Sequence, residues 1–520
     1  MANITKAPHE KELFGHPAGL YILFMTEMWE RFSYYGMRGI LVLYLTARTV
    51  GDNPGLGWLD AEALSLYGWY TMLVYVASIP GGIIADKIIG QKRSVMIGGF
   101  LLVAGHGILS IEEMWAFYTG LILIILGVGL LKPNISTLVG GLYKPGDERR
   151  DKGFSIFYIG INTGAALASL LVAWIADLYG WHAGFGLAAI GMVLGQLVYL
   201  SGQKYLVNVG NKPEKITKTD DNVSIAAIFS QQFSKKTPFL TTVILAVLSS
   251  WAAYSFIEDQ RLSYIIFFVF LSVVVGFMIT IYGDLKSRVE KDRYLVLLLS
   301  FIIVIVFWGA FEQAGGLMNL YAQNRTDRSL LGIEIPAAAF QFFNPFYIIL
   351  FAVPIANFWM WWKHRGKEAS SLFKMANGVI IMGLGFVFMV FASMQYESVG
   401  KSALYWLALA YLFHTIGELC ASPVALSFIT KLAPVRYGAL MMGVYFAATG
   451  LGNKVAGLIG ESASEAGEFT IFAGITIFCV LFGILVIAIM KPLKRLTHKA
   501  EDLREHQTDE EAEGFELADD

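Results

Sequence analysis

The chain has 520 residues, of which 56% are hydrophobic and 15% charged, and its formal net charge at pH 7 is -2. This composition, with a mean hydropathy of +0.57, excludes an ordinary soluble globular protein and indicates an integral membrane protein. The nearly neutral charge, with no basic run interleaved with aromatic residues, gives no indication of nucleic-acid binding. Cys420 and Cys479 both lie in apolar stretches, so neither a disulfide framework nor a metal site is predicted.

Apolar stretches of about twenty residues, long enough to cross a bilayer, recur along the whole chain. Fourteen are predicted, near residues 17–47, 61–85, 94–111, 115–138, 153–176, 182–202, 238–257, 263–283, 294–320, 336–360, 372–395, 402–430, 436–459 and 467–490. Most Lys and Arg residues fall in the loops of one side, together with both termini. This bias predicts an even number of spans with both termini in the cytoplasm.

The spans form two groups of six, separated by two additional spans. We therefore predict an all-α membrane protein with two six-helix bundles, a plan found in many secondary transporters that bind substrate between the halves. The predicted order is a cytoplasmic N-terminus (1–16), an N-terminal bundle (17–202), a cytoplasmic linker (203–237), two extra transmembrane helices (238–283), a second cytoplasmic linker (284–293), a C-terminal bundle (294–490) and an acidic cytoplasmic tail (491–520).

The first predicted span carries charged and aromatic residues at helical spacing. In Glu27-Met-Trp-Glu30-Arg31-Phe-Ser-Tyr34-Tyr35-Gly-Met-Arg38, the six numbered residues fall on one helix face, which we call the polar stripe. The stripe extends through roughly 16 Å, about half the hydrocarbon thickness. Because each ion facing lipid would cost roughly 2.5–3.5 kcal/mol, this face is predicted to line a water-filled cavity or a bundle interior.

Further ionisable residues lie inside other predicted spans, and their signs differ between the two halves of the chain. The bases Arg31, Arg38 and Lys132 lie in the first half, whereas the acids Glu312 and Glu418 lie in the second. Acid–base pairs between the halves can latch them together, because a buried pair is tolerated while either ion left alone costs several kcal/mol. Protonating the acid or binding a charged ligand would release such a latch.

Three motifs resemble signatures of one family. The string Glu27-x-x-Glu30-Arg31-Phe-x-Tyr34-Tyr35-Gly resembles the first-helix signature of the proton-coupled oligopeptide transporters, a branch of the major facilitator superfamily. Residues 82–90 (Gly-Ile-Ile-Ala-Asp-Lys-Ile-Ile-Gly) look like that family's loop motif, and residues 157–164 (Phe-Tyr-Ile-Gly-Ile-Asn-Thr-Gly) like its fifth-helix motif. The resemblance covers the whole chain, and the extra helix pair is similar to that of prokaryotic members.

The resemblance implies import of di- and tripeptides with protons across a bacterial inner membrane, by alternating access in a major facilitator fold. It implies proton coupling through Glu27, Glu30, Arg31 and Glu312. The implied substrate-binding residues are Arg31 and Lys132 for the peptide carboxylate, Glu418, Asn162 and Asn344 for the ammonium group, and Tyr34, Tyr35, Arg38, Tyr75 and Trp308 around the cavity. The implied gates are Arg38–Glu312 outside and Lys132–Glu418 inside. Animal members carry a histidine where this chain has Gly68, so coupling is expected to use carboxylates.

The physical chemistry of the substrate agrees with this interpretation. A short peptide is a zwitterion of nearly fixed length with arbitrary side chains, so a site that binds both termini recognises the whole class. The expected partners are the peptide, protons and the lipid bilayer, with no nucleic acid, no obligatory protein partner and no cofactor beyond the proton as coupling ion. The proteins of this kind are not enzymes, and no nucleophile–base constellation, metal site or ATP-binding P-loop stands out.

Other functions remain open from the residues alone. A channel is disfavoured, because the charges are distributed asymmetrically rather than in a repeated ring. Proton-coupled transport of nitrate or another small organic anion is the alternative within transport, although a bare anion would gain nothing from Glu418. Taken alone, Glu27 could also serve only to neutralise Arg31 for membrane insertion.

Overall fold

The computed structural model describes residues 11–144, 147, 149–212, 225–257, 261–434 and 437–500. Helices occupy the greater part of all fourteen stretches predicted from hydropathy, so the predicted all-α class is confirmed. Part of the predicted linker 203–237 and most of the predicted acidic tail 491–520 lie outside the described residues.

The chain forms two compact units. The first contains Met1–Lys215, Phe301–Ala425 and Tyr445–Ala488, and the second contains Ile216–Ser300, Leu426–Val444 and Ile489–Asp520. The helices α11 (Arg288–Phe311), α15 (Tyr405–Leu432) and α16 (Gly438–Ala466) contribute residues to both. Each unit is therefore assembled from segments far apart in the sequence, whereas the predicted boundaries follow chain order.

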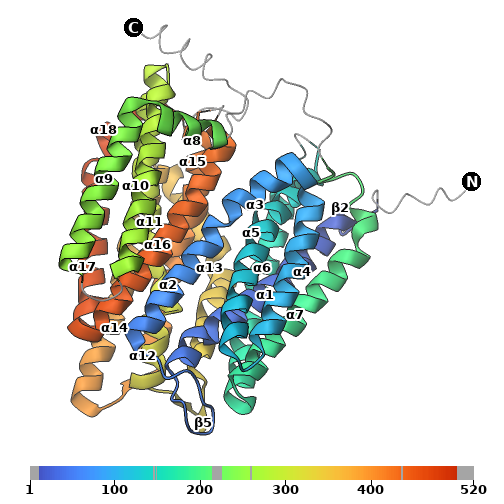
Figure 1. The fold of residues 1–520 in the computed structure, drawn as a ribbon, viewed down its shortest axis with the longest axis vertical. Helices are drawn as coiled ribbons and strands as arrows, with labels where there is room; N and C mark the ends of the chain where they lie inside the picture. Colours follow the sequence, from blue (N-terminus) through green and yellow to red (C-terminus); the bar gives the residue numbers. More distant parts are fainter. Residues whose placement is uncertain are drawn as a thin grey trace, which may run out of the picture. The chain divides into compact units, whose positions relative to one another are not determined.

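The first half of the chain forms a helical bundle within the first unit (Figure 1). Its elements are β1 (Glu12–Leu13), β2 (His16–Pro17), α1 (Ala18–Thr46), α2 (Asp60–Val76), α3 (Ser78–Ile84), η2 (Ala85–Ile89), α4 (Gln91–Leu109), α5 (Met114–Gly141), α6 (Arg149–Tyr179), α7 (Trp181–Ser201) and η3 (Gln203–Tyr205). Helix α1 packs against α6 and α7, and α4 packs against α5 and α7. Small residues permit these close contacts: a Cβ on Gly81 of α3 would lie 1.9 Å from the Gly129 carbonyl oxygen of α5.

The second half supplies the remaining elements of the first unit. After α11 come η4 (Glu312–Ala314), α12 (Leu317–Arg325), β3 (Thr326–Asp327), β4 (Ser329–Leu330), β5 (Ile333–Glu334), η5 (Ala337–Phe342), α13 (Phe343–His364), α14 (Ser371–Val399), β6 (Ser402–Ala403), α15, α16 and α17 (Glu468–Ala488). Strand β3 pairs with β6 in parallel, and β4 pairs with β5 antiparallel. The predicted span 294–320 is not one continuous helix, because the 3-10 turn η4 interrupts it at Glu312.

The second unit contains the two additional helices of the prediction. Its elements are α8 (Ile225–Ser234), α9 (Lys236–Phe256), α10 (Arg261–Asp284), the start of α11, the end of α15, the start of α16 and α18 (Met490–Leu496). Helices α9 and α10 pack together, and α8 contacts both. Buried Arg293 of α11 donates to the carbonyl oxygens of Thr497 (3.1 Å) and His498 (3.2 Å), which holds the end of the C-terminal helix.

Eleven helical stretches of the described residues are long and apolar enough to cross a membrane, by length and composition. Helix α1 is not among them, although it is 29 residues long, and it carries the four charges of the polar stripe. The exact number of spans and the side of the termini stay predictions.

Candidate functional site

The polar stripe of α1 is buried inside the protein. Glu27 and Arg31 are 3% exposed and Glu30 is 0% exposed, although all three side chains are ionisable. Helices α6 and α7 pack against α1 along its length. This burial is the arrangement that the cost of placing ions in lipid predicts.

Arg31 is the centre of an acid–base cluster on the stripe. Its Nε lies 3.1 Å from Glu27 Oε1 and also donates to Glu30 Oε2. One atom of each residue is buried without a hydrogen-bond partner among the described residues: Glu27 Oε2, Glu30 Oε1 and Arg31 Nη2. The two acids therefore share one guanidinium, and that guanidinium keeps an unused donor that can bind an anionic ligand.

Lys132 of α5 contacts an aromatic ring rather than an acid. Its Nζ lies 3.6 Å from the centroid of the Tyr75 ring on α2, a cation–π contact. In the part of the chain that the structure describes, Lys132 and Glu418 form no ion pair. The pair expected to gate the inner side is thus apart in this structure.

Glu418 of α15 is joined to α13 through a neutral side chain. Asn344 Nδ2 donates to Glu418 Oε2 at 2.8 Å and also lies 3.2 Å from Thr415 Oγ1. Asn162, expected near the same group, instead donates to the Tyr158 carbonyl oxygen one turn earlier in α6. The structure therefore unites Asn344 with Glu418 and leaves Asn162 bonded within its own helix.

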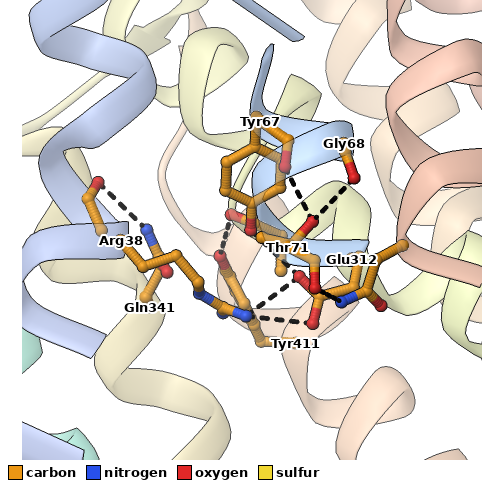
Figure 2. Close-up of polar contacts among 10 residues, drawn as sticks. Arg38, Tyr67, Gly68, Thr71, Glu312, Gln341 and Tyr411 are labelled. Carbon is orange, nitrogen blue, oxygen red and sulfur yellow. Dashed lines mark hydrogen bonds and ion pairs between the residues drawn. The ribbon is translucent and has the colours of Figure 1, made fainter. Parts of the chain in front are cut away.

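Arg38 and Glu312 form a buried ion pair between the two halves of the chain (Figure 2). Arg38 Nη1 lies 3.0 Å from Glu312 Oε1 and 2.9 Å from Oε2, and the Tyr67 hydroxyl of α2 donates to the same Oε2 at 3.0 Å. Arg38 is 6% exposed and Glu312 2%. The pair expected to gate the outer side is therefore formed, with a tyrosine as a third member.

Backbone geometry explains how Tyr67 reaches this pair. Glu312 begins the turn η4, which is followed by Gly315 and Gly316. A Cβ on Gly315 would lie 2.0 Å from the Tyr67 hydroxyl oxygen, so any larger residue would displace the tyrosine. The glycine after the turn thus makes room for the hydroxyl that donates to Glu312.

Aromatic side chains surround the charged residues. The rings of Tyr34 and Tyr35 meet edge to face at 5.5 Å, and the Arg38 guanidinium carbon lies 4.9 Å from the centroid of the Tyr35 ring. Trp308 of α11 packs edge to face on Phe311 at 5.1 Å. The Arg38 guanidinium thus makes a cation–π contact with Tyr35 in addition to its ion pair with Glu312.

Comparison with known proteins places this geometry in a family. The POT family model matches residues 92–473. The chain belongs to the POT family. It is 36% identical to the peptide transporter YePEPT of Yersinia enterocolitica, with 96% of this chain and 99% of that protein covered. It is 33% identical to a di-/tripeptide transporter of Lactococcus lactis, with 95% and 99% covered. A crystal structure of a peptide transporter POT in complex with sulfate covers 94% of this chain and 97% of its own, at 35% identity and a TM-score of 0.81.

As a member of the POT family, the protein is a membrane transporter with many apolar helices, and the prediction that it is not an enzyme is confirmed. The motifs that carried the family resemblance lie on α1, on α3 with η2, and on α6. Within this POT family protein, the structure brings Glu27, Glu30 and Arg31 together.

Residues that sequence reasoning did not select also join the two halves in this POT family protein, among them Tyr67, Asn319, Gln341 and Asn453. A signal for Tyr67 exists, because Tyr67, Thr71 and Tyr75 recur at intervals of four and share one face of α2. Asn319 and Gln341 donate to a backbone carbonyl, and such a partner leaves no pattern in the side chains.

Proposed function

We propose that this POT family protein is a proton-coupled symporter that imports di- and tripeptides across the cytoplasmic membrane of a bacterium by alternating access. Relatives named as peptide transporters support the substrate class. The observation that carries the proposal is a pair of buried groups of opposite sign within one compact unit. Arg31 offers an unused N–H donor, and Glu418 offers a carboxylate oriented by Asn344.

The two ends of a peptide are matched to these groups. Arg31 and Lys132 bind its carboxylate, because both are cations and the planar guanidinium suits a carboxylate best. Glu418 binds the ammonium group, with Asn344 and Asn162 as neutral partners. Tyr34, Tyr35, Arg38, Tyr75 and Trp308 surround the rest of the substrate. Their aromatic surfaces accept many side chains, which explains recognition of a class rather than of one sequence.

Charge balance links the proton to the peptide. Glu27 and Glu30 share Arg31, so this cluster has one negative charge in excess when both acids are ionised. A substrate carboxylate that binds Arg31 adds another negative charge, and protonation of one acid offsets it. Peptide and proton therefore favour each other's binding, which is the thermodynamic requirement for symport. The proton is the coupling ion, and the proposal includes no other cofactor.

Two ion pairs alternate in the proposed cycle. Arg38–Glu312 stabilises the closed outer side, and protonation of Glu312 breaks this ion pair and shifts the protein toward opening on that side. Lys132–Glu418 closes the inner side and separates when peptide and proton leave for the cytoplasm, where both termini lie. The formed outer pair and the separated inner residues correspond to a state that is closed outside and open inside.

The test is uptake of labelled dialanine by proteoliposomes that contain the purified protein. An imposed inward pH gradient is expected to drive accumulation of dialanine, and a protonophore is expected to abolish it. Unlabelled tripeptide should compete, whereas free alanine and nitrate should not; competition by nitrate alone would support the anion alternative, which the named relatives do not favour. Uptake that does not respond to the gradient would contradict the proposal.

A further inference from the structure

The carbonyl oxygen of Gly39, the residue after Arg38, accepts two hydrogen bonds from the second half of the chain. Asn319 Nδ2 on α12 lies 2.7 Å from this oxygen, and Gln341 Nε2 on η5 lies 3.4 Å from it. Figure 2 shows the Gln341 bond beside the Arg38–Glu312 pair. Both amides are buried, with Asn319 2% and Gln341 8% exposed. Two elements of one half thus converge on a single backbone atom of the other.

The orientation of the Asn319 amide is determined by this contact. Its Oδ1 is buried without a hydrogen-bond partner among the described residues, so the side chain gains its bond through the NH₂ group. Exchanging the two ends of the amide would place Oδ1 against the Gly39 carbonyl oxygen, and two acceptors repel each other. The geometry therefore requires an N–H donor at this position.

A third hydrogen bond between the halves has the same direction, from a donor on the second half to an acceptor on the first. Asn453 Nδ2 on α16, which is 0% exposed, lies 3.5 Å from the Thr71 carbonyl oxygen on α2. In all three cases an amide of the second half donates to a backbone carbonyl of the first half. Carboxamides and backbone carbonyls do not ionise in the physiological range, so none of these bonds changes with protonation.

We propose that Asn319 and Gln341, bonded to the Gly39 carbonyl oxygen, form an amide latch that holds the outer side closed independently of protonation. The inference rests on the proposed function, because outer closure is a step of alternating access. Arg38–Glu312 requires an ionised Glu312, whereas the amide latch does not. The closed state is thus held by one contact that titrates and one that does not, so protonation of Glu312 lowers the closed population without abolishing it.

The test measures closure directly, without substrate and without a pH gradient. Spin labels are attached at Val50→Cys and Val399→Cys, which are exposed residues of the first and second halves (77% and 70%), after the buried Cys420 and Cys479 are replaced by alanine. Electron–electron double resonance in lipid nanodiscs at pH 5 and pH 8 then gives the ratio of closed to open molecules.

The double variant Asn319→Ala/Gln341→Ala is expected to lower the closed-to-open ratio by a similar factor at both pH values, about fivefold for each lost neutral hydrogen bond. Glu312→Gln should retain a closed population that disappears when both amide substitutions are added. The matched control is Gln196→Ala, which removes a buried amide that donates to the Met96 carbonyl oxygen at 3.0 Å within the first half. Its distance distribution should equal that of the parent.

Asn319→Asp gives an independent test that a merely structural role would not satisfy. An ionised carboxylate cannot donate to the Gly39 carbonyl oxygen, but a protonated one can. Relative to the parent protein at the same pH, closure of this variant should therefore be reduced at pH 8 and recover at pH 5. If the double variant does not fold, this single variant decides the question, because the proposal is wrong if its closure relative to the parent protein does not increase with acid.

The amide latch is also contradicted if the double variant keeps the parental ratio at both pH values, or if Gln196→Ala lowers the ratio equally. These outcomes are separate from failure of the proposed function. If the double variant loses closure at both pH values and the parent protein shows no gradient-driven dialanine uptake, the symport proposal is overturned and the latch is retained.

Discussion

A glycine, which has no side chain, determines how closely α6 approaches the polar stripe. A Cβ on Gly164 would lie 2.1 Å from the Met28 carbonyl oxygen and 3.1 Å from Arg31 Cβ. The backbone of α6 therefore passes α1 at the level of the acid–base cluster. In membrane proteins such contacts between small residues bring helices together, because lipid provides no hydrophobic force between them. Gly164, the last residue of the fifth-helix motif, is thus a packing residue next to Arg31.

Gly164→Ala is expected to force α1 and α6 apart at Arg31. Overpacking of this kind typically costs about 1–3 kcal/mol, so the melting temperature of the purified protein should fall, and dialanine uptake should fall with it. The matched control is Gly107→Ala in α4, where an added Cβ meets no atom within 4 Å. Tryptophan fluorescence melting curves check both variants. Equal melting temperatures for Gly164→Ala and the parent protein would show that the contact relaxes freely.

The sequence was sufficient to predict that the charged residues of α1 are buried and that Arg38 pairs with Glu312, but it did not predict the contact of Lys132. Burial of the polar stripe followed from the cost of ions in lipid, which allows few alternatives. Lys132 contacts Tyr75 rather than Glu418, because the partner of a buried ion depends on tertiary packing that the pattern of residue types does not specify. The acceptor at Gly39 is a backbone atom, so no residue type could indicate it.

At the scale of elements, the N-terminal hairpin is fastened to the loop before α6. Arg149 Nη1 lies 2.9 Å from Glu12 Oε1 and 3.0 Å from the Gly15 carbonyl oxygen. Arg149 Nη2 also donates to Asp147 Oδ2 at 2.9 Å, and His16 Nδ1 lies 2.8 Å from the Tyr143 hydroxyl. One arginine therefore orients the loop and holds the hairpin that precedes α1.

Arg149→Ala is expected to release this hairpin, seen as faster hydrogen–deuterium exchange in residues 12–18 by mass spectrometry. Lys152→Ala, an exposed basic residue in the same helical turn, should leave exchange unchanged.

Hydrogen bonds from the Arg149 side chain and backbone lower the pKa of Asp147 below its usual value. The contribution of Asp147 is therefore present above the usual aspartate pKa and is lost as pH falls through the lowered value. Unchanged exchange in Arg149→Ala would show that the Arg149 contacts do not hold the hairpin.

The positions of the helices were predictable, whereas their interruptions were not. Runs of about twenty apolar residues indicate helices in a membrane, because only internal hydrogen bonding satisfies the backbone there. The 3-10 turn at Glu312 breaks a run that hydropathy presents as continuous. At this break Glu312 contacts Arg38 and Tyr67, which lie more than 240 residues away in sequence, and hydropathy gives no information about such contacts.

At the scale of the whole molecule, the proposed symport assigns different tasks to different acids: some carry the proton, and another binds the peptide. Glu27 of the first half contacts Arg31, whereas Glu418 of the second half accepts a hydrogen bond from Asn344 of the same half. An acid that only carries the proton is needed when a gradient drives net uptake. An acid that binds the peptide is needed in every mode of transport. Driven uptake and peptide counterflow separate these two contributions.

Glu27→Gln and Glu30→Gln are therefore expected to abolish pH-driven accumulation of dialanine and to retain counterflow, in which peptide exchanges with no net proton movement. Glutamine resembles the protonated acid, so Arg31 stays buried with a neutral hydrogen-bonding neighbour. Glu418→Gln should lose both modes, because the ammonium group loses its ionic partner and a buried charge is left unpaired. Glu465→Gln, an exposed acid on α16, is the control and should retain both. Accumulation by Glu27→Gln and Glu30→Gln at the parental level would exclude these acids from coupling and leave Arg31 neutralisation as their function.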